Sequence, residues 1–311
     1  MKLFHYTSFG LHIASEIECC ELLPNAATAE DDASIDVRIH YGEVPESLPD
    51  ANWQDAYFQT KPEQCLLVLN HIARYLVRNG NEIIIARAEE GSDCQVRLYL
   101  LGSCLGALLH ERGILAMHAS TISTERGAVL FTGPSGIGKS TLLGALLKRG
   151  YSMLADDITG IAINGDGQPL VLSGYPQVKL WAAAARKLDR PTGELRRVHP
   201  EMEKFALPMT AQFATEPMPL RSVYALARHH HKDITFEPVR NIDKFDIFVN
   251  NTYRHHFLDG LGLRPSHFKL AAAAAKTAKV TRIRRPDDSF LLDELADRIV
   301  EELTERMPKR N

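Results

Sequence analysis

Eight consecutive residues, Gly133 to Ser140, combine the glycines, the lysine and the hydroxyl group that bind nucleotide phosphates in many proteins. They read Gly-Pro-Ser-Gly-Ile-Gly-Lys-Ser and fit the pattern G-x-x-x-x-G-K-[ST]. Glycines let successive backbone N–H groups face phosphate oxygens, and a helix that starts there adds the positive end of its dipole. The predicted site for ATP consists of Gly133, Pro134, Ser135, Gly136, Ile137, Gly138, Lys139, Ser140 and Thr141.

Within this loop, two side chains have separate expected roles. Lys139 would contact the β- and γ-phosphates as a mobile point charge, and the Ser140 hydroxyl would ligate Mg²⁺. The alternative is a glycine-rich turn that only links a strand to a helix, which the flanking pattern makes the weaker interpretation.

Two adjacent carboxylates, Asp156 and Asp157, follow an apolar run that is typical of a short strand. Because side chains alternate along a strand, the two carboxylates cannot point the same way. We therefore expect one to face the metal and the other to face the incoming nucleophile. The alternative is a solvated turn.

The loop and the two acids need particular elements around them. Arg126 to Thr132 reads as a buried strand, Thr141 to Arg149 as a helix, and Tyr151 to Ala155 as a second strand. Ile114 to Met117 predicts a further strand that delivers His118 to the same end. By itself, a histidine in an apolar stretch is more often structural.

Three segments together resemble a known family. In order and spacing, Met117-His-Ala-Ser120, the glycine-rich loop and Arg149 to Asp157 resemble the catalytic domain of HPr kinase/phosphorylase. Gly174 to Trp181 is similar to the version in the broader HPr kinase-like group, which includes kinases of a serine on lasso-peptide precursors. The resemblance covers roughly residues 97 to 306 and is sharpest over 117 to 158. It implies an α/β fold with a P-loop kinase domain of the HPr kinase/phosphoenolpyruvate carboxykinase-like type.

The resemblance also implies roles for five residues. Lys139 corresponds to the phosphate lysine, and Ser140 and Asp156 to the magnesium partners. Asp157 corresponds to the general base that takes the proton of a substrate serine, and His118 would orient or tune Asp157.

Two departures favour kinase activity over phosphorolysis. The segment Val171 to Gly174 lacks the acidic residue and the arginine that a bifunctional HPr kinase/phosphorylase carries there. The arginine- and asparagine-rich segment that serves the phosphorylase reaction has no match either.

Several basic residues are weaker candidates for phosphate contacts. For Lys179 a solvated side chain is the commoner outcome, and for Arg196, Arg197 and Lys204 a charged surface loop is favoured. Asp189 to Glu203 reads as a segment able to close over substrate. We expect the run His229 to His231 to be solvent-exposed.

Composition restricts the partners. The 311 residues carry 36 basic and 39 acidic side chains, a net charge of −3, which does not favour nucleic acid. The chain shows no signal-peptide core and no apolar run near the ~20 residues of a membrane span, so we expect no membrane partner. Five cysteines without a C-x-x-C pair agree with a cytoplasmic protein.

The chain length predicts two domains. Residues 1–95 are expected to form a small mixed α+β domain that recognises substrate, regulates, or covers the core, and 96–311 the catalytic domain. In the second, the leucine spacing after Leu98 predicts a helix and Thr121 to Glu125 a polar turn. Ser222 to Ala227 and Ile234 to Val239 read as paired strands, and Ser266 as the cap of a helix.

The sequence thus predicts an ATP- and Mg²⁺-dependent kinase acting on a serine of a small protein or peptide. A lasso-type precursor peptide is the leading acceptor and HPr the second. A nucleotide-dependent switch and a kinase of small-molecule alcohols are the alternatives. A homo-oligomer is a further expectation from the resemblance, although the sequence identifies no interface.

Overall fold

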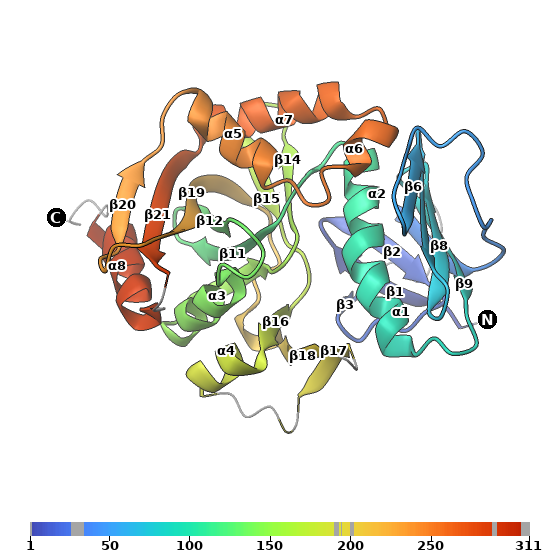
Figure 1. The fold of residues 1–311 in the computed structure, drawn as a ribbon, viewed down its shortest axis with the longest axis horizontal. Coiled ribbons are helices and arrows are strands. Elements are labelled where there is room, and N and C mark those ends of the chain that lie inside the picture. The colour runs from blue at the N-terminus through green and yellow to red at the C-terminus, as the bar shows by residue number, and fades with distance from the viewer. Residues whose placement is uncertain are drawn as a thin grey trace.

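The computed structural model describes residues 2–25, 34–189, 193, 195–199, 202–287 and 291–305. It is a mixed α/β protein with two large sheets and one small one. Figure 1 shows the N-terminal strands at one end of the long axis and the C-terminus near the other, with a long helix standing between the two large sheets. No described helix combines the length and apolar character that a membrane crossing requires.

The N-terminal sheet has nine strands in the order β3-β1-β2-β4-β9-β8-β7-β6-β5. Its inner face and its outer face each bury an apolar cluster, as the alternation Cys65, Leu66, Leu67 along one strand illustrates. The strands are β1 (Phe4–Ser8), β2 (Leu11–Ser15), β3 (Leu23–Pro24), β4 (Val37–Tyr41), β5 (Trp53–Gln54), β6 (Phe58–Lys61), β7 (Gln64–Leu69), β8 (Ala73–Arg78) and β9 (Glu82–Arg87).

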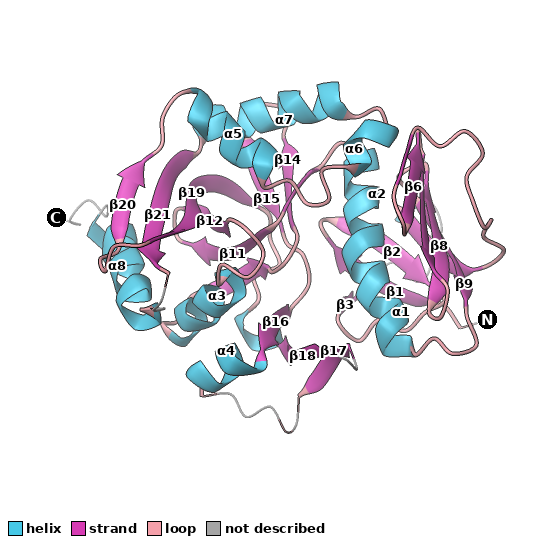
Figure 2. Cartoon of the chain, viewed as in Figure 1, coloured by secondary structure: helices cyan, strands magenta, loops and turns pink. Residues whose placement is uncertain are grey.

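This part is not the mixed α+β unit that the sequence predicted. The elements described before Ser92 are the strands β1 to β9, as Figure 2 shows. The predicted loop at residues 26–32 lies outside the described residues. The prediction of a boundary near residue 95 stays a prediction, although a helix does begin at Asp93.

A single helical rod covers the inner face of the N-terminal sheet. It consists of α1 (Asp93–Tyr99), a π-helical turn (Leu100–Cys104) and α2 (Leu105–Glu111). Ser92 starts it with a capping box. The helix predicted after Leu98 is therefore confirmed, with an earlier start. Gly102 and Gly106 face the ring of Tyr253, where a Cβ at Gly106 would lie 2.7 Å from a ring carbon.

The second large sheet runs in the order β10-β14-β15-β19-β12-β11-β13, with β21 beside β19 and β20 beside β21. Among the described strands of this sheet, only the pairs β12–β19 and β19–β21 are parallel. Its strands are β10 (Leu115–Met117), β11 (Ala119–Thr124), β12 (Gly127–Thr132), β13 (Ser152–Ala155), β14 (Thr159–Ile163), β15 (Pro169–Leu172), β19 (Met218–His229), β20 (Thr235–Pro238) and β21 (Lys279–Pro286).

Helices cover both faces of this sheet (Figure 1). Along β12, Val129 and Phe131 pack toward α3 and α8, while Ala128 and Leu130 pack toward α5 and α7. A sheet that is buried on both faces explains why β12 is apolar throughout. These helices are α3 (Lys139–Lys148), α5 (Ile242–Asn250), α7 (Arg264–Thr277) and α8 (Leu292–Glu305), whereas the short α6 (Phe257–Gly260) packs against β5 and β6 of the N-terminal sheet.

A small third sheet, in the order β16-β18-β17, lies beside α3. It contains β16 (Gln177–Trp181), β17 (Arg196–His199) and β18 (Met202–Pro208), and α4 (Ala182–Lys187) follows β16. The closing segment predicted for 189–203 falls partly outside the described residues; its described part includes β17.

Three local predictions are wrong. Thr121 to Thr124 belong to β11, because the strand continues to a tight turn before Gly127. β20 does not pair with β19, because β21 lies between them. Ser266 lies inside α7, where its hydroxyl donates to the Leu263 carbonyl.

The tip of the β1–β2 hairpin joins the two lobes of the protein. The N-terminal lobe is the first sheet with its covering helix, and the other lobe is the second sheet with the helices that pack on it. Phe9 and Gly10 form its two-residue turn, with φ angles of 53° and 70°. The Phe9 ring is 1% exposed and lies against Gly160 and Gly174, and its N–H donates to the Ser173 carbonyl at 2.6 Å. The packing compensates for a left-handed conformation that phenylalanine disfavours.

We expect Phe9→Ala to lower the free energy of unfolding by about 3 kcal/mol, because the lost ring leaves a cavity between the lobes. Urea denaturation measures the change. Phe268→Ala is the matched control, since that ring is 43% exposed on α7. Equal losses in the two variants would contradict a special role of the hairpin tip.

Candidate active site

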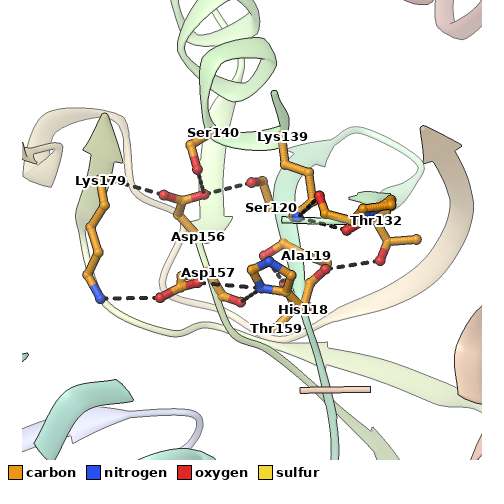
Figure 3. A network of polar contacts seen from close by, with 12 residues as sticks. His118, Ala119, Ser120, Thr132, Lys139, Ser140, Asp156, Asp157, Thr159 and Lys179 are labelled. Carbon is orange, nitrogen blue, oxygen red and sulfur yellow. Dashed lines mark hydrogen bonds and ion pairs between the residues drawn. The ribbon is translucent and has the colours of Figure 1, made fainter. Parts of the chain in front are cut away.

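The structure gathers His118, the glycine-rich loop, Asp156 and Asp157 at one end of the second sheet. Figure 3 shows these side chains with Lys179, which enters from β16. Gly133 to Gly138 connect β12 to α3, which begins at Lys139 and includes Ser140 and Thr141. Strand, loop and helix therefore occur as predicted, with Leu142, Leu143, Leu146 and Leu147 buried.

Asp156 is the most completely bound side chain of the group. It is buried, and its Oδ1 accepts hydrogen bonds from the hydroxyls of Ser120 at 2.6 Å and Ser140 at 2.9 Å. Its Oδ2 accepts the backbone N–H of Lys179 at 3.1 Å. One carboxylate thus joins β11, α3 and β16, and these three hydrogen bonds compensate for its burial.

Asp157 occupies a strained turn. Its φ is 72°, and the N–H of Ile158 donates to the Asp156 carbonyl at 2.9 Å, which closes a three-residue turn. The reversal sends the Asp157 side chain away from Asp156. The two carboxylates therefore diverge, as the sequence predicted, but a turn rather than strand alternation separates them. Such strain is often found at functional sites.

His118 holds this turn from the junction of β10 and β11. Its Nδ1 lies 3.0 Å from the Asp157 carbonyl oxygen and 3.4 Å from Oδ1 of the same residue. Both are acceptors, so Nδ1 carries the proton. Burial, aided by the charge of Lys139, lowers the pKa of His118, and the ring is neutral at pH 7. His118 therefore orients Asp157 as a neutral donor.

Lys179 is not the solvated lysine that the sequence favoured. Its side chain is 7% exposed, and its Nζ lies 3.4 Å from Asp157 Oδ2. Burial alone would lower the pKa of Lys179, but Tyr175 and Asp157 raise it above its ordinary value. Lys179 therefore stays charged. Its alternation with the apolar Val178 and Leu180 is typical of a half-buried strand with the lysine facing solvent, so the local pattern gave no signal of this burial.

The charge of Lys179 acts on Asp157 in turn. Burial by itself would raise the pKa of the Asp157 carboxyl, but the ammonium groups of Lys179 and Lys204 lower it to about 2. The side chain remains 23% exposed, so it is both ionised and accessible. An ionised, accessible carboxylate can accept a hydrogen bond from a hydroxyl group.

Lys139 folds back onto its own loop. Its Nζ donates to the carbonyls of Gly133 at 2.8 Å and Pro134 at 3.1 Å. Burial, aided by Lys204, lowers the pKa of Lys139 to about 8 despite the nearby carboxylates. The ammonium is therefore poised to exchange two carbonyls for a stronger anionic partner.

The oxygen ligands present fit a magnesium ion that arrives with a nucleotide. Among the described residues no three His, Cys, Asp or Glu side chains cluster as a resident metal centre would require. Ser140 and Asp156 offer hard oxygen donors side by side at the start of α3. Mg²⁺ is commonly bound by one or two such groups together with substrate phosphates.

The remaining basic candidates separate into two groups. Arg196 forms an ion pair with Glu21, which Arg97 also contacts, and thus binds the lobes together. Arg197 and Lys204 lie over the rings of Phe205 and Trp181, each at 5.9 Å from the ring centroid. Lys204 acts electrostatically on both Asp157 and Lys139.

The histidine run begins at the last residue of β19 and continues into the turn that follows. His230 is almost fully exposed and pairs with Asp287 at 2.9 Å, and the Nε2 of His229 donates to the Asp233 carbonyl at 2.7 Å. The exposure predicted for the run is confirmed for His230 and His231, whereas His229 is half-buried.

We expect Asp157→Asn to remove a contribution to the free energy of unfolding that wild type loses as the pH falls into the acid range. A carboxyl whose pKa falls from 3.8 to about 2 on folding stabilises the protein by about 2 kcal/mol above pH 4, and this is lost as pH falls through 2. Urea denaturation at pH 5 and pH 2.5 should therefore show a larger loss for wild type than for the variant. Asparagine tolerates the positive φ, so the backbone is kept. Equal losses would contradict the low pKa.

Known proteins show only a distant structural similarity to this chain. No family model matches the sequence, and no curated protein matches it. Among solved structures, the Hpr(Ser) kinase/phosphatase from Coxiella burnetii is similar with a TM-score of 0.34 and 13% identity, over 62% of this chain and 97% of that chain. A TM-score this low does not establish a common fold, so this chain is similar to that enzyme only distantly.

Proposed function

We propose that this chain is an ATP- and Mg²⁺-dependent kinase that transfers the γ-phosphate to a serine hydroxyl of a peptide or small protein. The observation that carries the proposal is Asp157, an ionised and accessible carboxylate held between His118 and Lys179 beside the glycine-rich loop. The HPr kinase-like order of the motifs around residues 117–157 supports the same reaction. A lasso-type precursor peptide is the first proposed acceptor and HPr the second.

The glycine-rich loop would bind the nucleotide. The N–H groups at the start of α3 and the ammonium of Lys139 supply positive charge for phosphate oxygens. Mg²⁺ would be held by Ser140 and Asp156 together with the phosphates, and when bound it would neutralise phosphate charge. Lys139 would leave the Gly133 and Pro134 carbonyls for the phosphates.

Asp157 would receive the acceptor. Its carboxylate accepts the hydrogen bond of the serine hydroxyl and aims the oxygen at the γ-phosphorus. The serine Oγ forms the new P–O bond, the bond to the β-phosphate oxygen breaks, and ADP leaves. The hydroxyl proton passes to Asp157 as the P–O bond forms, because an acid with a pKa near 2 is a weak base before that point.

His118 and Lys179 have supporting roles in this mechanism. His118 fixes the backbone turn that presents Asp157, and Lys179 fixes the carboxylate. Because Lys179 stays protonated, its charge also counters the negative charge that collects around the transferred group.

We expect Asp157→Asn to abolish phosphate transfer and leave ATP affinity nearly unchanged, since the carboxylate serves the acceptor. Transfer from γ-labelled ATP with Mg²⁺ to HPr and to a lasso-type precursor peptide, with mass spectrometry of the labelled residue, measures the first. Fluorescent ATP-analogue titration measures the second. Asp166→Asn, in the exposed turn between β14 and β15, is the matched control.

Each result of that experiment has a distinct meaning. Label on a serine in wild type and the control, lost in Asp157→Asn, supports the kinase. ATP binding without transfer to either acceptor contradicts these two substrates and favours a nucleotide switch. Loss of ATP binding in Asp157→Asn would instead make Asp157 part of the nucleotide site.

We expect ATP affinity to fall about tenfold between pH 7 and pH 9. Lys139 loses its charge as pH rises through about 8, while the phosphates, with a second pKa of about 6, are already ionised. Titration of the fluorescent analogue across this range measures the change. Lys139→Ala should bind more weakly and show a flat profile; an equally steep profile in that variant would assign the titration to another group.

A further inference from the structure

Two arginines from neighbouring strands donate hydrogen bonds to backbone carbonyls of the glycine-rich loop. The Nη2 atom of Arg228, near the end of β19, donates to the Gly136 carbonyl at 3.1 Å. The Nη2 atom of Arg285, near the end of β21, donates to the Ile137 carbonyl at 2.9 Å. Neither residue belongs to the motif that predicted the loop, and both are distant from it in sequence.

These contacts bear on the direction of the loop N–H groups. In a trans peptide the C=O and the N–H point in opposite directions. The bond from Arg285 to the Ile137 carbonyl therefore turns the Gly138 N–H away from the arginine. The Ile137 N–H donates to the Pro134 carbonyl at 3.2 Å and closes a turn. Arg228 binds the Gly136 carbonyl within this turn.

The loop retains free donors in this arrangement. Within the described parts of the chain, the N–H groups of Ser135, Gly136 and Gly138 have no protein acceptor. Successive free N–H groups form a concave site for an anion. The carbonyls that would repel an anion are instead occupied by Lys139, Arg228 and Arg285.

The two arginines are also direct neighbours. Arg228 lies opposite Arg285 in the register of the parallel strands β19 and β21, beside β12, whose end starts the loop. Like charges on adjacent strands disfavour each other, and Arg285 is only 6% exposed. Burial and the charge of Arg228 accordingly lower the pKa of Arg285. A bound anion beyond the loop would relieve this repulsion at the carboxyl ends of the strands, where ligands of such sheets bind.

We propose that Arg228 and Arg285 are positioning residues of the nucleotide site, which fix the carbonyls of Gly136 and Ile137 so that the loop N–H groups remain directed at a polyphosphate. The inference rests on the proposed function, because it assigns the polyphosphate to that loop. The arginines act through the loop and do not take part in phosphate transfer.

Arg228→Ala tests this with little risk to folding, because the side chain is exposed. We expect the dissociation constant of a fluorescent ATP analogue to rise about 5- to 10-fold, as expected for loss of a charge-assisted hydrogen bond. Arg228→Lys, which keeps a charged donor, should recover part of the affinity. Arg221→Ala is the matched control, since Arg221 lies at the opposite end of β19. Arg285→Lys should weaken binding similarly.

A second readout separates positioning from direct phosphate contact. Without nucleotide, hydrogen exchange at the Ile137 amide, whose N–H donates to the Pro134 carbonyl, should be faster in Arg228→Ala than in wild type or Arg221→Ala, because Arg228 no longer holds the turn. Unchanged exchange with weakened binding would overturn the positioning role in favour of a direct contact.

The outcomes also distinguish this inference from the proposed function. If wild type binds no ATP analogue, the proposed nucleotide site itself is wrong. If wild type binds and the variants of Arg228 and Arg285 bind equally well, the nucleotide site stands and the positioning role is wrong. Weakened binding with faster loop exchange supports both.

Discussion

The site depends on the carboxylate of Asp156. Its hydrogen bonds from Ser120, Ser140 and the Lys179 backbone join a strand of the second sheet, the helix after the glycine-rich loop and the third sheet. Each donor is buried or nearly so, and losing one would leave a buried polar group without a partner. The turn at Asp157 follows directly in the chain, so its strained geometry is anchored by the most satisfied residue of the site.

The positively charged side chains of the site and of the glycine-rich loop are paired with oxygen atoms of the protein. Lys139 and Arg285 are buried and donate to loop carbonyls, while Lys179 pairs with Asp157. Buried cations are costly unless such partners are present. Burial lowers the pKa of Lys139, which makes it responsive to alkaline pH, and the charges of Lys179 and Lys204 lower the pKa of Asp157, which keeps it ionised. A polyphosphate would meet this charge at the free N–H groups of the loop.

The N-terminal lobe supports the site from the other side. Phe9 packs beneath the segment around Gly174, and the Tyr175 hydroxyl donates to the Leu101 carbonyl in the π-helical turn at 3.4 Å. A helical turn of this kind frees a carbonyl for such a contact. Arg97 and Arg196 meet at Glu21, so ion pairs as well as apolar packing cross between the lobes. The N-terminal lobe therefore contacts and supports the segment that leads to Lys179.

The sequence by itself determined the local unit of strand, glycine-rich loop and helix around Gly133 to Ser140, and the strand that ends just before Asp156. These follow from spacing and periodicity over a few residues, which local backbone preferences control. Tertiary structure decided that Lys179 is buried against Asp157, that Arg228 and Arg285 hold the loop, and that β21 separates β20 from β19. It also decided that the N-terminal lobe is built from strands. The physical reason is that these contacts depend on the order of strands in a sheet, which joins residues far apart in sequence and leaves no mark on the local pattern.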